Sequence, residues 1–246
     1  MGGGEHVPAW AAAGLAHCAA ADGGRFAAIM ARCGPPEYLG KAVLEDGACG
    51  ALCRIIVGQQ LAGSAASAIW RRTVRALRPE RGDSAAFDAA AVLAAAAAST
   101  DGGLPDDLRT ACGLSRAKAR AVVATCRAFD SGELSDELLA TCQVDALRQK
   151  LCAIKGVGPW SCDMYLLFHL KKADVLPLGD LGVRAGAAKA FAVKGSGKNG
   201  ALDAKKDAAK LEALFAPFAP YRSLAAFYCW RVVDTKAFTQ DADVEK

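Results

Sequence analysis

A helical repeat that runs into a pair of glycines is the feature of this chain that most limits its fold. Apolar residues recur at helical spacing through residues 144–154, Gly156-Val157-Gly158 follows, and a second helical segment covers 160–170. This pattern predicts two helices joined by a tight hairpin. Glycines let backbone amides approach a phosphate, and a helix N-terminus favours an anion. Taken alone, however, a G-x-G between helices is more often only a turn.

The remainder of the chain also favours helices. It has 246 residues, of which 53% are hydrophobic and only 9 are proline, and it shows no alternating strand pattern. We therefore expect an all-α protein, with one large domain or two small ones that share a core. Three segments are expected. Residues 1–48 form a helical segment that packs on the C-terminal helices, 49–143 form a helical lobe, and 144–246 form a lobe with the hairpin.

The cysteines and the apolar runs indicate which cofactors and which cellular compartment the protein can have. The ten cysteines are scattered through helical patterns without any CxxC, so neither a zinc site nor a cysteine-ligated iron–sulfur cluster has its expected ligand spacing. Reduced, mostly buried thiols in an intracellular protein are the better interpretation. No apolar run is long enough to span a membrane, and the first residues do not form a secretory signal.

The net charge of +4 is too small to identify a partner. Residues 194–206 form a Gly/Lys-rich polar stretch, which predicts an exposed loop. For its lysines a solvated surface is the favoured interpretation.

Asp180 stands alone just before a predicted helix, and two interpretations of it are compatible. An isolated Asp in this position is usually an N-cap. A helix N-terminus also keeps a carboxylate ionised, and an ionised carboxylate can stabilise a sugar cation or orient an attacking water.

Aromatic and amide side chains supply the other candidates. Trp70 is expected in the core, as most helical tryptophans are, whereas Trp160 directly follows the hairpin and Trp230 lies in the last predicted helix. Aromatic walls are what a pocket for an extruded base requires. Gln59 and Gln60 occupy a polar-tipped turn, residues 58–63, between two predicted helices.

Five ordered motifs together carry a family resemblance. They are Gly58-Gln59-Gln60, Gly113-Leu114-Ser115, the stretch KGVGPWS at 155–161, Asp174-Val175 followed by Asp180-Leu181-Gly182, and Pro220-Tyr221-Arg222-Ser223 ending at Trp230. From about residue 51 to 233 the chain resembles the helix–hairpin–helix DNA glycosylases, closest to the 3-methyladenine DNA glycosylase II group. The resemblance implies the short, two-lobed all-α form, without the N-terminal β-domain of the bacterial enzyme.

The resemblance assigns DNA-binding roles in the hairpin and the glutamine turn. Gly156, Gly158 and Ser161 match the positions that donate to a DNA phosphate. Gln60, with Gln59 beside it, matches the residue that wedges into the duplex when a nucleotide is flipped out. The backbone carbonyls of three hairpin residues match those that hold a Na⁺ or K⁺ ion at the phosphate: Cys152, Ile154 and Val157.

The resemblance assigns the chemistry to Asp180, which matches the catalytic aspartate. Trp160 and Trp230 match aromatics of the base pocket, and Met164 lies in that pocket where the bacterial enzyme has an aromatic. The family usually has a proline two residues before the aspartate, whereas Pro177 lies three before Asp180.

The reaction type depends on one position. Members of the family that also cleave the DNA backbone carry a lysine nucleophile where this chain has Trp160, and Lys155 lies on the other side of the turn. The resemblance therefore implies simple hydrolysis, with no cofactor for catalysis.

We therefore predict a monomeric, monofunctional glycosylase. It would remove alkylated purines such as 3-methyladenine and 7-methylguanine from double-stranded DNA in base excision repair, leaving an abasic site. Its setting would be the nucleus in a eukaryote and the cytoplasm otherwise, with no membrane partner. Two alternatives stay open: a non-catalytic helix–hairpin–helix DNA-binding protein, and a glycosylase/lyase for other damaged bases.

Overall fold

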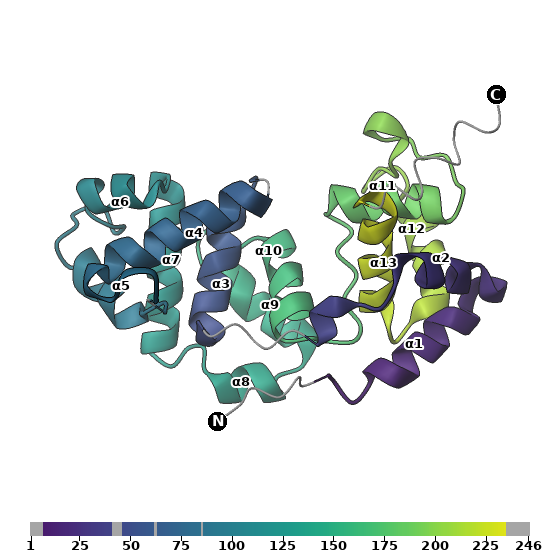
Figure 1. Ribbon diagram of the computed structural model, residues 1–246, viewed down its shortest axis with the longest axis horizontal. Helices are drawn as coiled ribbons and strands as arrows, with labels where there is room; N and C mark the ends of the chain where they lie inside the picture. The colour runs from purple at the N-terminus through teal and green to yellow at the C-terminus, as the bar shows by residue number, and fades with distance from the viewer. Residues whose placement is uncertain (1–6, 41–45, 62, 85, 235–246) are drawn as a thin grey trace. The chain divides into compact units, whose positions relative to one another are not determined.

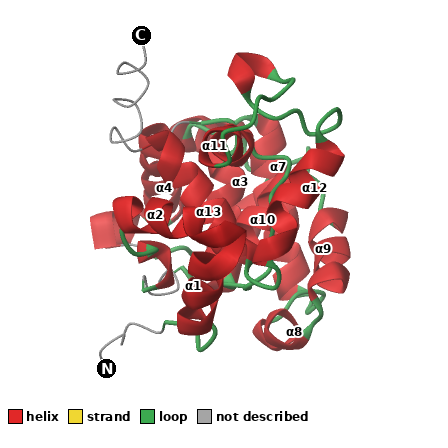
Figure 2. Ribbon diagram, turned by 90° about the vertical axis from the view of Figure 1, so that its right-hand side faces the viewer, coloured by secondary structure: helices red, strands yellow, loops and turns green. Residues whose placement is uncertain are grey.

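The computed structural model describes residues 7–40, 46–61, 63–84 and 86–234, and these residues are helical without a single strand (Figures 1 and 2). Two compact units divide the chain, one of residues 1–42 with 171–246 and one of residues 43–170. No helix among the described residues reaches the length and apolarity that crossing a membrane demands. The all-α prediction is confirmed.

The described residues of the unit 43–170 form eight α-helices. They are α3 (Gly47–Gly58), α4 (Gly63–Leu77), α5 (Ala89–Ala96), α6 (Asp106–Cys112), α7 (Arg116–Asp130), α8 (Asp136–Thr141), α9 (Val144–Ala153) and α10 (Pro159–Met164), the last continued by a π-helical turn, Tyr165–His169. Helix α7 begins at a side-chain N-cap, because Ser115 Oγ accepts a hydrogen bond from the Lys118 amide at 3.2 Å.

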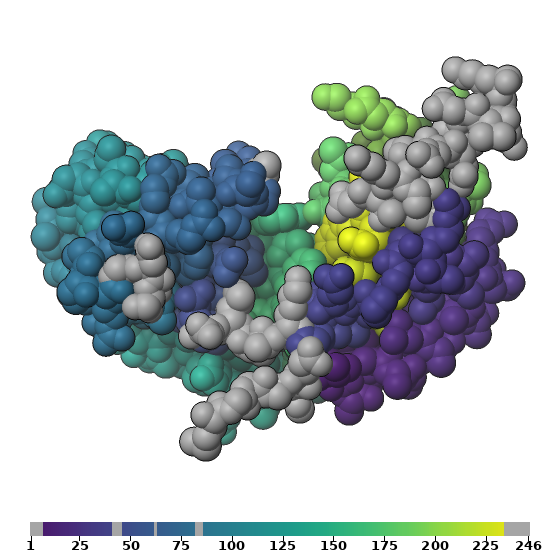
Figure 3. Space-filling model, viewed as in Figure 1, coloured from purple at the N-terminus to yellow at the C-terminus, as the bar shows by residue number. Residues whose placement is uncertain are grey.

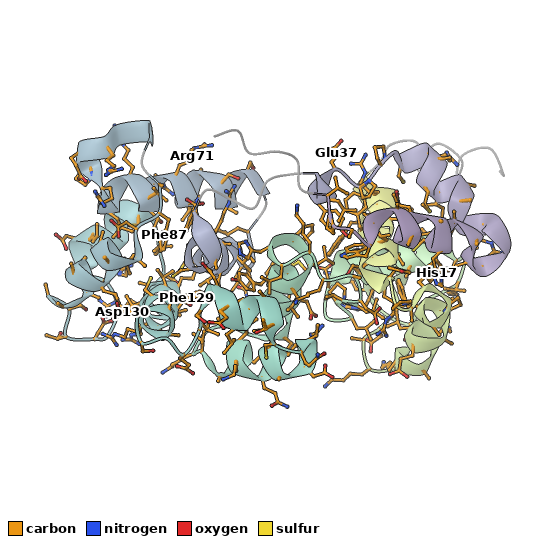
Figure 4. The ribbon with its side chains drawn as sticks, turned by 90° about the horizontal axis from the view of Figure 1, so that it is seen from below. His17, Glu37, Arg71, Phe87, Phe129 and Asp130 are labelled. Carbon is orange, nitrogen blue, oxygen red and sulfur yellow. The ribbon has the colours of Figure 1, made fainter. Side chains whose placement is uncertain are left out.

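Helix α3 forms the centre of this unit and packs against α7 and α4. Leu52 and Ile56 on its inner face are fully buried, and each such side chain contributes about 1.5–3 kcal/mol of burial free energy. Trp70 of α4 is 5% exposed and stacks on Phe87, the ring labelled in Figure 4, which confirms its predicted place in the core.

The other unit is built from both ends of the chain. Its helices are α1 (Ala11–Ala20), α2 (Arg25–Cys33), α11 (Leu181–Ala190), α12 (Ala208–Phe215) and α13 (Arg222–Asp234). Figure 3 shows the N-terminal residues, in purple, lying against α13, in yellow. Buried aromatic rings join the two ends: Phe26 of α2 lies 4.5 Å from Phe218 and 5.9 Å from Tyr228 between ring centroids.

Helices α11 and α13 pack unusually closely because α11 carries glycines on the contact face. A Cβ on Gly186 would lie 1.9 Å from the carbonyl oxygen of Cys229, so only glycine fits there. This close approach brings together two candidate site residues, because Asp180 is the N-cap of α11 and α13 carries Trp230.

The boundaries of the units differ from those of the three predicted segments. The hairpin belongs to the unit of α3 and α7, whereas Asp180 belongs to the unit of the N-terminal helices. The sequence pattern follows chain order and could not show that residues 171–246 share a core with the N-terminus. The three-segment division stays a prediction.

Candidate functional site

The predicted hairpin is formed by α9, a short turn and α10. Gly156 adopts φ +98°, and a Cβ there would lie 2.4 Å from the Cβ of Ala121 on α7, so glycine is required twice over. Val157 is 4% exposed, and its amide donates to the Ile154 carbonyl at 3.0 Å. The buried side chain anchors the turn to the core of the unit.

Gly158 differs from Gly156 in a way that bears on binding. Its backbone is extended, at φ −97°, and a Cβ there would meet nothing within 4 Å. The fold of the free protein therefore does not require glycine at this position. A ligand that approaches the backbone closely would require it.

The glutamine turn is fastened to the hairpin by Gln59. Its Nε2 donates to the Gly156 carbonyl at 2.9 Å and to Ser161 Oγ at 2.8 Å. Because the Gly156 carbonyl can only accept, the amide nitrogen of Gln59 must face it. Ser161 is 2% exposed, so its predicted phosphate-binding hydroxyl lies under the Gln59 side chain.

Lys118 of α7 holds the other side of the same turn. Its Nζ donates to the Val57 carbonyl at 2.7 Å and to the Gln59 carbonyl at 2.8 Å, and burial lowers the pKa of this ammonium group. The turn thereby presents Gln60, which is exposed and adopts φ +59°, followed by Leu61, which is 37% exposed. Of the two glutamines, Gln60 is the one whose side chain projects outward.

Between the turn and the hairpin lies a groove of about 890 Å³. It is lined by residues 58–61 and 156–161, which include Gln60, Gly158 and Trp160. Trp160 is half-buried in its wall, whereas Met164, one helical turn further along, is only 6% exposed. An ion pair of Arg148 with Asp163 fixes α9 to α10 beneath it.

Asp180 lies at the N-terminus of α11, where both predicted roles meet. Its Oδ1 accepts hydrogen bonds from the Val183 amide at 2.9 Å and from Trp230 Nε1 at 2.7 Å. The side chain is half-buried. Two donors on one oxygen fix the direction of the carboxylate.

Gly182 makes the contact with Trp230 sterically feasible. A Cβ there would lie 2.8 Å from Trp230 Cδ1 and 3.1 Å from Asp180 Oδ1. The unusual proline spacing also has a structural account. The Asp180 amide donates to the Pro177 carbonyl at 2.9 Å, so Pro177 begins a tight turn that ends on the aspartate.

A polar cluster supports this turn. Its residues belong to the sequence motifs, but the motifs did not reveal their structural role. Asp174 accepts two hydrogen bonds from the Arg222 guanidinium, at 2.6 and 2.7 Å, which lowers the pKa of the carboxyl group. Ser223, also on α13, accepts from the Val175 amide at 2.9 Å and donates to the Lys172 carbonyl at 2.7 Å. The segment leading to Asp180 is thus bound to the start of α13.

The structure gathers the predicted residues into two sets. Asp180 and Trp230 form one set with Gly182, in the unit that contains α11 and α13. The hairpin and glutamine-turn residues, with Trp160 and Met164, form the other set in the unit of α3 and α7.

Residues that could hold a metal ion lie in two places. The three predicted cation ligands are backbone carbonyls at the end of α9 and in the turn, where a helix C-terminus favours a cation. The carbonyl of Ile154 accepts from Val157, and its second lone pair leaves it able to bind an ion as well. These oxygens fit a Na⁺ or K⁺ ion.

A cysteine cluster was not predicted, because its third member is distant in sequence from the other two. Cys49 and Cys53 of α3 and Cys126 of α7 bring their sulfurs within 4.8 Å of one another. Hydrogen bonding to the other two thiols lowers the pKa of Cys49 to about 5, whereas burial raises that of Cys53. Three thiolates suit a soft metal ion, although structural zinc sites use four ligands. The sequence signal for this cluster was the Cys-x3-Cys spacing, which places Cys49 and Cys53 on one face of a helix.

Comparison with known families agrees with this architecture. The chain belongs to the HhH-GPD superfamily of base excision DNA repair proteins, whose model matches residues 53–213. The resemblance inferred from the motifs is thus confirmed.

Among curated proteins, the chain is similar to two from Schizosaccharomyces pombe. It is 28% identical to the alkylbase DNA glycosidase-like protein mag2 over 49% of this chain and 53% of that protein. It is 28% identical to DNA-3-methyladenine glycosylase 1 over 57% of this chain and 58% of that protein. The chain thus spans about half the length of the curated relatives it matches.

Solved structures give the same fold. The S. pombe 3-methyladenine DNA glycosylase Mag1, in complex with abasic DNA, matches with a TM-score of 0.71 at 23% identity, over 91% of this chain and 97% of that one. A DNA-3-methyladenine glycosidase from Bacillus halodurans matches with a TM-score of 0.61 at 26% identity, over 88% and 92% of the two chains. The predicted all-α glycosylase fold is confirmed.

Proposed function

We propose that the protein is a monofunctional DNA glycosylase that hydrolyses the N-glycosidic bond of alkylated purines, such as 3-methyladenine and 7-methylguanine, in double-stranded DNA. The observation that carries the proposal is the Asp180 carboxylate, aimed by the Val183 amide and by Trp230 Nε1 at the start of α11. The family membership and the names of the similar proteins support the substrate class.

The proposed reaction begins with capture of the DNA backbone at the hairpin and insertion of Gln60 into the duplex. The damaged nucleotide is extruded, and Trp230, which donates to Asp180, supplies a face for its base. Water adds its hydroxyl group to C1′ of the sugar as the bond to the base breaks, and the remaining proton of the water is released to solvent. The cationic base departs as a neutral molecule, while Asp180 stabilises the positive charge that develops on the sugar.

Trp160 supports hydrolysis rather than strand cleavage, because an indole cannot form a Schiff base. The protein would act as a monomer in base excision repair, in the nucleus of a eukaryote or the cytoplasm of a bacterium. A Na⁺ or K⁺ ion held by the carbonyls of Cys152, Ile154 and Val157 would strengthen phosphate binding. Replacing both ions with tetramethylammonium should then weaken DNA binding.

Asp180→Asn tests the proposal. Asparagine also caps helices, so the variant should fold normally. It should bind abasic-site DNA like the parent protein and lose about 10²–10⁴-fold in single-turnover base release. Base release at the parental rate would show that Asp180 is only a cap. Release of none of a panel of methylated, deaminated and etheno purines by the parent protein would favour the non-catalytic alternative.

Trp230→Phe separates two roles of one side chain. Phenylalanine keeps an aromatic face but cannot donate to Asp180, so we expect slower base release with little change in the binding of abasic DNA. Borohydride should trap no covalent DNA adduct with the parent protein. A trapped adduct would instead identify a glycosylase/lyase.

A further inference from the structure

Most of the net positive charge of the chain comes from one short segment, residues 194–210, which covers a loop and the first residues of α12 and which we call the basic loop. It carries five lysines against two aspartates, a net charge of +3, whereas the whole chain carries +4. All five lysines are exposed. They are Lys194, Lys198, Lys205, Lys206 and Lys210. The other residues of the chain are therefore almost neutral in sum.

The two aspartates of the basic loop are occupied by its own donors. Asp207 is 9% exposed, and its Oδ2 accepts from the amide and the hydroxyl of Ser196 and from the Asp203 amide, each at 2.8 Å. These hydrogen bonds lower the pKa of Asp207 to about 2. Asp203 accepts from the amides of Lys205 and Lys206 at 2.9 and 2.8 Å. Both carboxylates thus stabilise the loop from within, while the lysine side chains extend from its surface.

The loop also has a defined shape rather than that of a flexible linker. A Cβ on Gly195 would lie 2.1 Å from the Ala201 carbonyl oxygen, and one on Gly197 would lie 2.8 Å from the same atom. The Gly197 amide donates to that carbonyl at 2.8 Å, and Ala201 and Leu202 are buried. A preorganised loop loses less conformational entropy when a partner binds.

The basic loop is anchored to the helix that carries the candidate catalytic residue. Arg184 donates to the Leu202 carbonyl at 2.7 Å. Arg184 follows Asp180 by four residues, about 6 Å along α11. Figure 1 shows the short helix Lys198–Gly200 of this loop projecting beyond α11. The lysines thus belong to the same unit as the aspartate, and the loop that carries them is bonded to the helix that begins at the aspartate.

We propose that the basic loop is a DNA-backbone binding surface that contacts phosphates beside the damaged nucleotide, without reading sequence. This inference rests on the proposed function, because it assigns the loop to the DNA on which Asp180 acts. Lysines act as point charges on phosphate oxygens and release condensed counterions, which produces affinity that falls steeply with salt. The hairpin would hold the backbone through amides, whereas the basic loop would hold it through charge.

The test replaces four lysines with glutamine: K194Q, K198Q, K205Q and K206Q together. Lys210 is left in place because it pairs with Asp207 and with the Lys194 carbonyl. For an undamaged duplex, we expect affinity at low salt to fall about 10–100-fold. The slope of log K against log salt should flatten by about 0.9 for each phosphate that the variant no longer neutralises. Single-turnover base release at saturating DNA should stay at the parental rate.

Two controls complete the design. Arginine at the same four positions should restore both affinity and salt slope, because the charge is kept. K150Q with R127Q removes two exposed charges from the other unit and should leave the slope near the parental value, whereas K205Q with K206Q should flatten it. An unchanged slope in the glutamine variant, with base release intact, would overturn the inference about the basic loop and leave the proposed function unaffected. Base release that survives Asp180→Asn would instead overturn the proposed function.

Discussion

The hairpin and the surroundings of Asp180 differ in what they present to a ligand: the hairpin presents backbone, and the other region presents a carboxylate. In the hairpin, Gly158 leaves open space where a Cβ would stand, and the groove beside it is lined by backbone and neutral side chains. At Asp180, two donors hold a carboxylate oxygen in one direction. In the proposed reaction, phosphate capture requires an accessible backbone, whereas base removal requires a fixed carboxylate.

Both regions need glycine, but for different physical reasons. Gly156 is needed for a left-handed backbone conformation in a turn, whereas Gly186 is needed for the contact of two helices that both have ordinary backbone angles. Substituting each should therefore damage one activity of the protein and not the other.

Gly186→Ala should have the largest effect. Its new Cβ would collide with the backbone of Cys229, which cannot move without shifting α13, so we expect a loss of about 3 kcal/mol in the free energy of unfolding. Base release should fall because Trp230 moves with α13. Urea denaturation and single-turnover kinetics measure both. Gly179→Ala is the control, since a Cβ there meets nothing within 4 Å; equal stability of the two variants would refute this account of the α11–α13 contact.

Gly156→Ala should be next in size and should affect binding. Alanine at φ +98° and 2.4 Å from Ala121 Cβ should cost about 2 kcal/mol of stability and reduce affinity for abasic DNA at least tenfold. Gly158→Ala sharpens the comparison. It should keep parental stability and still lose DNA affinity, because its methyl group fills only the space a phosphate would approach. Parental affinity in Gly158→Ala would argue against phosphate capture at the hairpin.

Asp174→Asn should have a smaller effect that depends on pH. Arg222 lowers the pKa of Asp174, so the pair contributes stability above the unfolded-state pKa of about 4 and loses it as pH falls through the lower folded-state value. Because both side chains are about one-third exposed, we expect a loss of about 1–2 kcal/mol at pH 7. The variant should show a shallower decline in stability below about pH 4. An unchanged acid profile would contradict the assignment.

Asp163 in the hairpin region should behave with the opposite sign. Burial raises its pKa despite Arg148, so the protonated form favours folding and this contribution is lost as pH rises through the folded-state value. Asp163→Asn should therefore remove a contribution that increases the free energy of unfolding as pH falls. Asp174→Asn should instead remove a contribution that decreases it. Stability measured from pH 3 to pH 7 for both variants tests the difference.

Local patterns predicted most of the fold, because helices, caps and the hairpin depend on neighbouring residues. The Asp180 cap, the turn at Gly156 and the core position of Trp70 follow from spacing and side-chain chemistry alone. Contacts between distant segments were not predictable. The motifs contained Asp174 and Arg222, but nothing in their spacing showed that they form an ion pair 48 residues apart. The same limit concealed the approach of Cys49 to Cys126.

The sequence could not distinguish the roles of Gln59 and Gln60, because these adjacent glutamines differ only in their structural environments. Gln59→Ala should remove the hydrogen bonds to Gly156 and Ser161 and cost only about 0.5–1 kcal/mol of stability, since the site is half-exposed. Gln60→Ala removes no such contact, so its stability should stay within about 0.5 kcal/mol of the parent while base flipping weakens. A 2-aminopurine fluorescence assay of nucleotide extrusion, alongside urea denaturation, distinguishes the two. If Gln59→Ala impaired extrusion without any loss of stability, Gln59 would act on DNA directly rather than by fastening the turn to the hairpin.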